Sequence, residues 1–301
     1  MIQVGIFTGY FPYALEETAR RVRAHGFNTV QLDLSFKDMD LATTSITTAK
    51  CRRIRDVFRA HNLPVCAVSG YTNIIHPDPA IRAANLERLR TIIRHAWECG
   101  SPYVITETGT YNPDSDWAPH PDNFTEAGYA ELRDVVGELT RVSAEHGATL
   151  LLEPYVSNVI DSVEKAARLF SDIPGPGLAL LMDPTNYFNG HNIGRMDAVL
   201  NRIFDVLGDR IRISHAKDVK PSYGDTSEKH ADIDASEGHT FRGIGDIELP
   251  APGLGMLNYD LYLKLLYRRY PNIPMIIEHL DEPDVARAKT FVDEKLMAAG
   301  A

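Results

Sequence analysis

The chain has 301 residues, of which 44% are hydrophobic and 24% are charged, an ordinary composition for a folded globular protein. Its formal net charge of −10 argues against nucleic acid as the main partner, because binding to phosphates needs a basic surface. No apolar run approaches the ~20 residues of a membrane span, so no membrane partner is expected. Residues Met1–Phe7 are expected to form a strand rather than a signal peptide.

The three cysteines are Cys51, Cys66 and Cys99, an odd number whose spacing matches no zinc site. Each lies in or beside an apolar run, where a buried and reduced thiol is the expected state. Because reduced thiols are typical of the cytoplasm, they predict a cytoplasmic protein.

Eight short runs of apolar and β-branched residues recur along the chain and are predicted to be strands. Their nearly continuous hydrophobicity is typical of parallel strands that are covered on both faces. The runs are Val4–Phe7, Thr29–Leu34, Val65–Val68, Tyr103–Thr106, Thr149–Leu152, Leu178–Met182, Arg210–Ser214 and Met275–Ile277.

A helical pattern follows each predicted strand. Asp78 and Pro79 are typical of a helix start, with a capping side chain before a proline at the first helical position. Gly26 is a plausible helix stop. The predicted helices are Leu15–His25, Thr47–His61, Pro79–Gly100, Thr125–Gly147, a helix that begins at Asp161, then Gly194–Leu207, Asp260–Tyr270 and Pro283–Met297.

Eight alternating β and α units predict a single α/β domain over residues 1–301, closed as a (β/α)8 TIM barrel. The alternative, an open doubly wound sheet, requires a glycine-rich phosphate turn after the first strand. The segment Thr8–Pro12 has no such turn. Two long connections, residues 109–123 and 218–258, are expected to be lids or substrate walls, or else surface excursions or subunit contacts.

Four side chains that can bind a metal stand at the carboxyl ends of the last four predicted strands: Glu153, Asp183, His215 and Glu278. In a barrel these positions converge on one mouth. Any one of them could be a strand-end group with a structural partner, but four at successive strands predict a metal site. This donor set suits Mn²⁺, Mg²⁺ or Co²⁺ better than a thiol-selected metal, and Zn²⁺ is also possible.

Such a site has the parts that proton abstraction next to a carbonyl requires. A divalent cation stabilises the enediolate that forms, one carboxylate acts as the base, and a second carboxylate or the same one returns the proton. The sequence therefore predicts an enzyme that uses one divalent metal ion.

Four motifs resemble those of the xylose isomerase-like barrels, a family of sugar isomerases and epimerases that also contains endonuclease IV. They are Leu152-Glu153-Pro154, Met182-Asp183-Pro184-Thr185-Asn186, His215-Ala216-Lys217-Asp218 and Ile277-Glu278-His279. The resemblance spans essentially the whole chain. It implies that Glu153, Asp183, His215 and Glu278 bind one metal ion, with Mn²⁺ as our first choice, and that Glu153 and Glu278 are the catalytic pair that exchanges protons on opposite faces of a substrate carbon, as in the tagatose 3-epimerase-like members.

The chain departs from the family pattern at Asn186, where epimerases and endonuclease IV usually carry histidine. The nuclease also needs histidines at strands three and four, where this chain has Ser69-Gly70 and Glu107-Thr108. His230 and Asp232 form a His-x-Asp pair, which we interpret as a solvated loop rather than a second metal site.

Six further residues are predicted to contact substrate: Asn186, Lys217, Arg242, Glu107, Tyr10 and Trp117. Lys217 is expected to contact substrate or to pair with Asp218, and Arg242 to hold a substrate group or lie on the surface. His279 follows Glu278 directly, so its side chain should point to the opposite face of the strand and pack against a helix. Other aromatic residues expected at the mouth, for stacking on sugar or for closing the barrel, are Phe11, Phe36, Tyr71, Tyr155 and Tyr187.

The leading hypothesis is a metal-dependent sugar isomerase or epimerase whose partner is an unphosphorylated small-molecule sugar. The second is a lyase or dehydratase that eliminates a β-substituent from an oxidised sugar or glycoside, including carbon-linked glycosides. A non-catalytic sugar-binding subunit is a third, and a nuclease the last. By analogy with related barrels, a homo-oligomer is expected.

Overall fold

The computed structural model describes residues 2–222, 243 and 245–300. Each of the eight predicted strands is present. β2 ends at Leu32 rather than at Leu34, and β7 extends to Ala216, so that His215 lies inside the strand. The strands are β1 (Gln3–Phe7), β2 (Thr29–Leu32), β3 (Val65–Ser69), β4 (Tyr103–Glu107), β5 (Thr149–Glu153), β6 (Leu178–Met182), β7 (Ile211–Ala216) and β10 (Pro274–Ile277).

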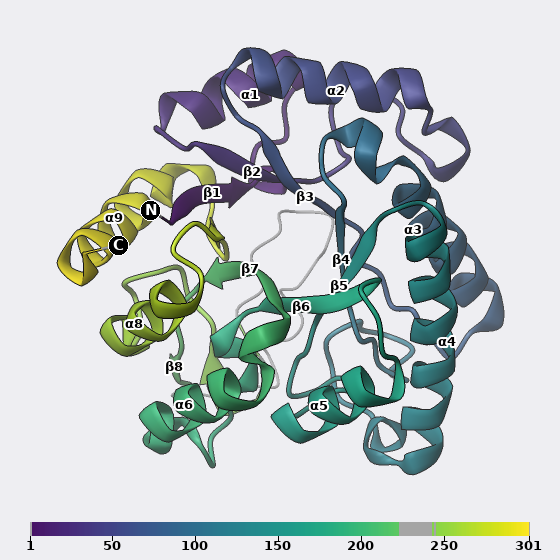
Figure 1. Cartoon of the computed structure of the whole chain (residues 1–301), viewed down its shortest axis with the longest axis vertical. Helices are drawn as coiled ribbons and strands as arrows, with labels where there is room; N and C mark the ends of the chain where they lie inside the picture. Colours follow the sequence, from purple (N-terminus) through teal and green to yellow (C-terminus); the bar gives the residue numbers. More distant parts are fainter. Residues whose placement is uncertain (1, 223–242, 244, 301) are drawn as a thin grey trace.

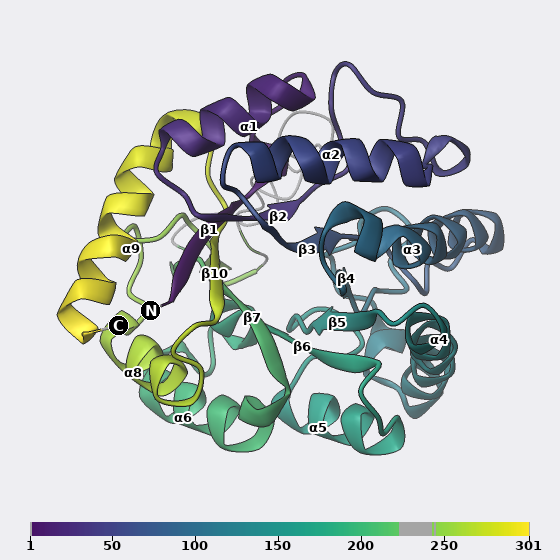
Figure 2. The same cartoon turned by 45° about the horizontal axis from the view of Figure 1, so that its top comes forward.

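These strands close into a barrel in the order β1-β10-β7-β6-β5-β4-β3-β2, and every neighbouring pair is parallel. Helices lie around the outside of the ring (Figure 1 and Figure 2). The predicted (β/α)8 TIM barrel is therefore confirmed.

Side chains along each strand alternate between the barrel interior and the layer beneath the helices. In β5, Leu151 packs inside the barrel, whereas Leu150 and Leu152 belong to the larger core outside it. The interior cluster consists of Ala67, Ile105, Leu151, Ala179, Leu181, Ile213 and Ile276. This alternation decides which residues at the strand ends can face the mouth.

The helices begin and end close to the predicted residues. Asp78 caps α3 by accepting hydrogen bonds from the backbone N–H groups of Ala80 and Ile81, and Gly100 ends the helix with a φ of 107°. The helices are α1 (Leu15–Ala24), α2 (Thr48–Ala60), α3 (Pro79–Cys99), α4 (Glu126–Glu145), α5 (Val163–Asp172), α6 (Met196–Leu207), α8 (Tyr259–Arg269) and α9 (Val285–Ala299).

One predicted helix start is wrong. Ser162, not Asp161, caps α5, because its hydroxyl accepts the backbone N–H of Lys165 three residues later, as a capping side chain must. Asp161 instead pairs with the Lys165 ammonium at 2.9 Å. Both residue types can cap a helix, so the sequence pattern alone did not separate them.

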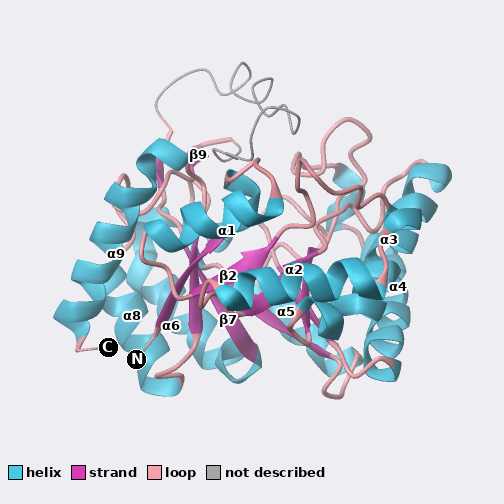
Figure 3. Ribbon diagram, turned by 90° about the horizontal axis from the view of Figure 1, so that it is seen from above, coloured by secondary structure: helices cyan, strands magenta, loops and turns pink. Residues whose placement is uncertain are grey.

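The two long connections contain short elements that carry no periodic signal in the sequence. Residues 109–123 run into a 3-10 turn at Pro121–Phe124, and the connection after β7 holds the antiparallel pair β8 (Lys220–Pro221) and β9 (Ile247–Glu248). In Figure 3 the long loops gather at one end of the barrel, away from the end where β1 begins. This is the carboxyl end of the strands.

The three cysteines form no disulfide; Cys51 and Cys99 are buried and Cys66 is partly buried. Across residues 2–222 and 245–300, none of the helices combines the length and the hydropathy of a membrane span.

Candidate metal centre at the carboxyl end of the barrel

The site is built from the inward-facing positions at the strand ends. Leu151, Leu181, Ile213 and Ile276 face the barrel interior, and each is followed two residues later by a polar side chain. Because strand side chains repeat every two residues, those polar side chains face the same interior. They are Glu153 on β5, Asp183 after β6, His215 on β7 and Glu278 after β10.

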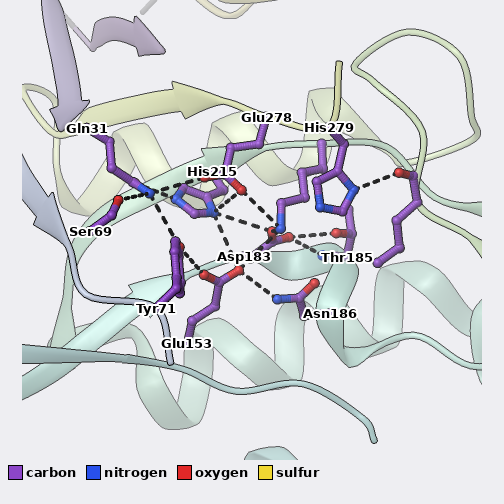
Figure 4. A network of polar contacts seen from close by, with 12 residues as sticks. Gln31, Ser69, Tyr71, Glu153, Asp183, Thr185, Asn186, His215, Glu278 and His279 are labelled. Atoms are coloured by element: carbon purple, nitrogen blue, oxygen red, sulfur yellow. Dashed lines mark hydrogen bonds and ion pairs between the residues drawn. The ribbon is translucent and has the colours of Figure 1, made fainter. Parts of the chain in front are cut away.

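These four predicted ligands meet at one point. One donor atom of each lies within 4.8 Å of those of the other three, and all four residues are buried. His215 Nδ1 is 3.5 Å from Glu153 Oε1, 3.6 Å from Asp183 Oδ2 and 3.3 Å from Glu278 Oε2 (Figure 4). Bonds of ~2.0–2.2 Å to a central ion would leave ligand atoms separated by about these distances.

The outer contacts of His215 show that the residues fit a metal ion. His215 Nε2 donates a hydrogen bond to Gln31 Oε1 at 2.8 Å, because a carbonyl oxygen can only accept. In the neutral ring this places the proton on Nε2 and leaves Nδ1 with a free lone pair. Nδ1 is buried and makes no hydrogen bond to the described residues, and it faces three carboxylates. A ligating histidine has this arrangement.

Lys217 also reaches the cluster, and it is only 4% exposed. Its Nζ lies 2.7 Å from Asp183 Oδ2, 3.2 Å from Glu278 Oε2 and 3.3 Å from Glu153 Oε1. Burial lowers the pKa of Lys217, but Asp183, Glu153 and Glu278 outweigh it and raise the pKa well above its usual value. The ammonium is therefore charged and offsets part of the buried negative charge.

The two glutamates have different environments. Glu153 accepts hydrogen bonds from Tyr71 at 2.5 Å and from Asn186 Nδ2 at 2.8 Å. Burial raises the pKa of Glu153, but the positive charges of Lys217 and His215 lower it by more, so that the pKa is about 2. Burial is the dominant effect at Glu278 and raises the pKa of that carboxyl despite His215 and Lys217. Glu153 is thus held ionised, whereas Glu278 binds a proton more readily.

The same carboxylates act on His215. Burial lowers the pKa of His215, but Glu278, Glu153 and Asp183 raise it to about 10. Because a metal ion binds only the neutral imidazole, the ion has to displace this proton.

Glu107 is the inward residue at the end of β4 and lies in register with Glu153 on β5. It is 3% exposed and accepts no hydrogen bond from the described part of the chain. Burial and then the charges of Glu153 and Asp116 raise the pKa of Glu107 well above its usual range. Glu107 therefore binds a proton more readily than an exposed glutamate, and in its protonated form it could donate a hydrogen bond.

The other predicted substrate residues take different positions. Tyr10 is buried, and its hydroxyl accepts the backbone N–H of His279 at 2.7 Å. Trp117 is partly buried and stands edge-on to Tyr155, with ring centroids 6.4 Å apart. Arg242 lies outside the described residues, as do His230 and Asp232.

One expectation around the third motif needs correction. Lys217 does not pair with Asp218, whose carboxylate accepts backbone N–H groups from Val219, Gly253 and Leu257. Lys217 and Asp218 are neighbours, so in extended backbone their side chains point to opposite faces.

His279 lies just after β10, in the fourth motif. Its Nδ1 donates to the carbonyl of Leu249, just after β9, and its own φ is 62°. This left-handed backbone turns the chain away from the strand, so the strand periodicity used for the prediction does not extend to this residue.

Gln31 is the functional residue that sequence reasoning missed. It lies on β2 between Val30 and Leu32, and besides accepting from His215 it donates to Glu278 Oε1 at 3.2 Å and Ser69 Oγ at 3.2 Å. A signal was present, because an amide inside an otherwise apolar buried strand needs partners.

Replacing Gln31 with leucine is expected to weaken Mn²⁺ binding by about 10–100-fold, the usual effect of losing the partner that orients a ligating histidine. Isothermal titration of the variant and the native protein measures this change. Ser69→Ala is the matched control, because it removes another partner of Gln31 and leaves the bond to His215 in place. Equal affinity of the native protein and the leucine variant would contradict the orienting role.

Comparison with known proteins agrees with this architecture. Residues 19–295 match the family model of the xylose isomerase-like TIM barrel. No curated protein shows significant sequence similarity to the chain.

Several solved structures share the fold at low sequence identity. L-ribulose 3-epimerase is 15% identical with a TM-score of 0.69, covering 99% of this chain and 96% of its own. The probable 3-DHS dehydratase AsbF from Bacillus anthracis is 13% identical with a TM-score of 0.71, covering 97% of this chain and 99% of its own. A xylose isomerase-like TIM barrel protein from Mycobacterium smegmatis, in complex with magnesium, is 16% identical with a TM-score of 0.68, covering 100% of this chain and 97% of its own.

At these identities the structures show a common fold only, and the family assignment depends on the sequence model. Because that model matches residues 19–295 of a closed eight-stranded barrel, the chain belongs to the xylose isomerase-like TIM barrel family.

Proposed function

We propose that Glu153, Asp183, His215 and Glu278 hold one divalent metal ion. The observation that carries this proposal is the convergence of four buried donor atoms within 4.8 Å, with His215 Nδ1 among three carboxylate oxygens and without a hydrogen bond to the described residues. Three oxygens and one nitrogen suit Mn²⁺ best, with Mg²⁺, Co²⁺ or Zn²⁺ as alternatives. The related magnesium complex from Mycobacterium smegmatis supports a hard divalent ion in this kind of barrel.

We further propose that the protein is a sugar isomerase or epimerase that removes a proton next to a carbonyl. When bound, the ion would stabilise negative charge that develops on the substrate. Glu153, which is held ionised, takes the proton, and Glu278, whose pKa is raised, returns one. In this proposal one carboxyl group takes a proton from the substrate and the other gives one back.

The charge of the site favours an uncharged substrate. The carboxylates of the cluster carry at most three negative charges, and a divalent ion would offset two of them, with the positive charge of Lys217 close by. Burial raises the pKa of Glu107, which disfavours a further negative charge there. We propose that Asn186, Lys217 and Glu107 contact substrate hydroxyls and that Tyr10 and Trp117 belong to the wall of the site.

Solvent exchange tests this function directly. The protein is incubated with Mn²⁺ and a panel of neutral ketoses in D₂O, and the products are followed by NMR. We expect one deuterium at a carbon next to the carbonyl, together with an epimer or isomer of the sugar. Absence of exchange across the panel, in protein that contains the metal, would reject proton abstraction from these sugars.

Lys217 favours one second candidate, a lyase that eliminates a β-substituent from an oxidised sugar or glycoside. Such a reaction starts with the same proton abstraction and then needs a donor for the leaving group, and a charged ammonium stands within 3.3 Å of both glutamates. The fold shared with a probable dehydratase is compatible with it. Release of water or an aglycone from a 3-keto glycoside would favour the lyase, whereas deuterium uptake without product loss favours the epimerase.

A further inference from the structure

The Lys217 ammonium and the proposed metal share the same partners. Lys217 Nζ contacts Glu153 Oε1, Asp183 Oδ2 and Glu278 Oε2. These are the three oxygen atoms that surround His215 Nδ1 in the proposed ligand set. The same three carboxylate oxygens would therefore bind both the Lys217 ammonium and the proposed metal ion.

An ammonium and a divalent ion compete for these oxygens at close range. The ion needs bonds of ~2.0–2.2 Å to them, and the ammonium stands only 2.7–3.3 Å from the same atoms. Both would then lie within a few ångströms of each other, with strong repulsion and no room for water between them.

Hydrogen bonds hold the backbone at Lys217 in place. Its carbonyl accepts a hydrogen bond from the Tyr259 hydroxyl at 2.6 Å. The next residue, Asp218, is held by three backbone N–H groups, so its carboxylate does not bind the ammonium. The four-carbon stem of lysine is flexible and can withdraw the ammonium alone.

We infer that Lys217 is an internal cation that competes with the metal for the three carboxylates and withdraws from them when the metal binds. This inference rests on the proposed metal site. The direction in which metal affinity changes when Lys217 is removed distinguishes two roles. If Lys217 only positions the ligands, its removal weakens metal binding. If it competes with the metal, its removal strengthens metal binding.

The test is the Mn²⁺ affinity of Lys217→Met, measured by chelator competition on the full chain. We expect an affinity at least about tenfold higher than that of the native protein, and a lower melting temperature in the absence of metal because the buried carboxylates lose their counter-ion. Lys220→Met is the matched control; it removes a nearby positive charge that pairs with Glu248 at 3.2 Å, and should bind Mn²⁺ as the native protein does. If Lys217→Met does not fold, Lys217→Gln replaces it with the same expected direction.

The outcomes separate this inference from the proposed function. If the native protein binds Mn²⁺ and the Lys217 variant binds it no more tightly, Lys217 does not compete with the metal, and the proposed metal site is unaffected. No binding by either protein overturns both. Binding by the variant alone supports the competition and rejects the metal-dependent function, because Lys217 would then hold the site permanently.

Discussion

Glu153→Gln is expected to lower kcat by about 10²–10⁴-fold, the usual contribution of a positioned general base. The amide has the shape of the carboxylate but cannot take a proton. The fold should be unaffected, because the substitution removes one negative charge from a buried cluster of three and leaves an oxygen that can still accept from Asn186 or Tyr71. The measurement is turnover at saturating Mn²⁺, so that loss of a ligand is not mistaken for loss of the base.

The control is Glu145→Gln at the exposed end of α4, an equal change in charge far from the mouth that should leave turnover unchanged. Circular dichroism confirms that both variants fold. Native turnover in the Glu153 variant would rule out its role as the base, whatever the metal content.

Asp183→Asn is expected to reduce Mn²⁺ affinity by more than about 100-fold. Losing a residue that only orients a ligand costs up to about 100-fold, and this substitution changes a proposed ligand itself. Asparagine was chosen over alanine for a structural reason. Asp183 Oδ1 accepts the backbone N–H and the hydroxyl of Thr185, and an asparagine oxygen can keep these bonds. The amide nitrogen then replaces Oδ2, the atom that faces His215 and Lys217.

Elemental analysis after dialysis measures the metal per chain. Thr185→Val serves as the control, since it disturbs the same turn and leaves Oδ2 in place. Full occupancy in the asparagine variant would remove Asp183 from the ligand set. A parallel loss in the valine variant would attribute the effect to the turn instead.

The sequence predicted the barrel and the four converging side chains because both follow from local patterns. Continuous apolar runs indicate buried parallel strands, and the residue after such a run stands at the carboxyl end of the barrel. The positions of Glu153 and Asp183 at the mouth could be predicted without knowing which strands are neighbours in the barrel.

The residues that were missed or misplaced depend on contacts across the barrel. Gln31 and His215 are 184 positions apart, and the residues around Gln31 do not indicate which side chain it contacts. The prediction for Lys217 considered its neighbour Asp218, whereas its partners lie on three other strand ends. At His279 the left-handed backbone ends the strand periodicity on which the prediction of its side-chain direction depended.

The bond between Gln31 on β2 and His215 on β7 ties the proposed metal site to closure of the barrel. Glu278 follows the last barrel strand and Gln31 lies on the second, so a chain whose ends have not met lacks one proposed ligand and the residue that orients another. An ion that binds only the closed ring stabilises that ring over every partly assembled form. At an ion concentration ~1,000 times the Kd, this preference amounts to about 4 kcal/mol. If the proposed ion binds there, its supply would also affect how much of the protein stays folded.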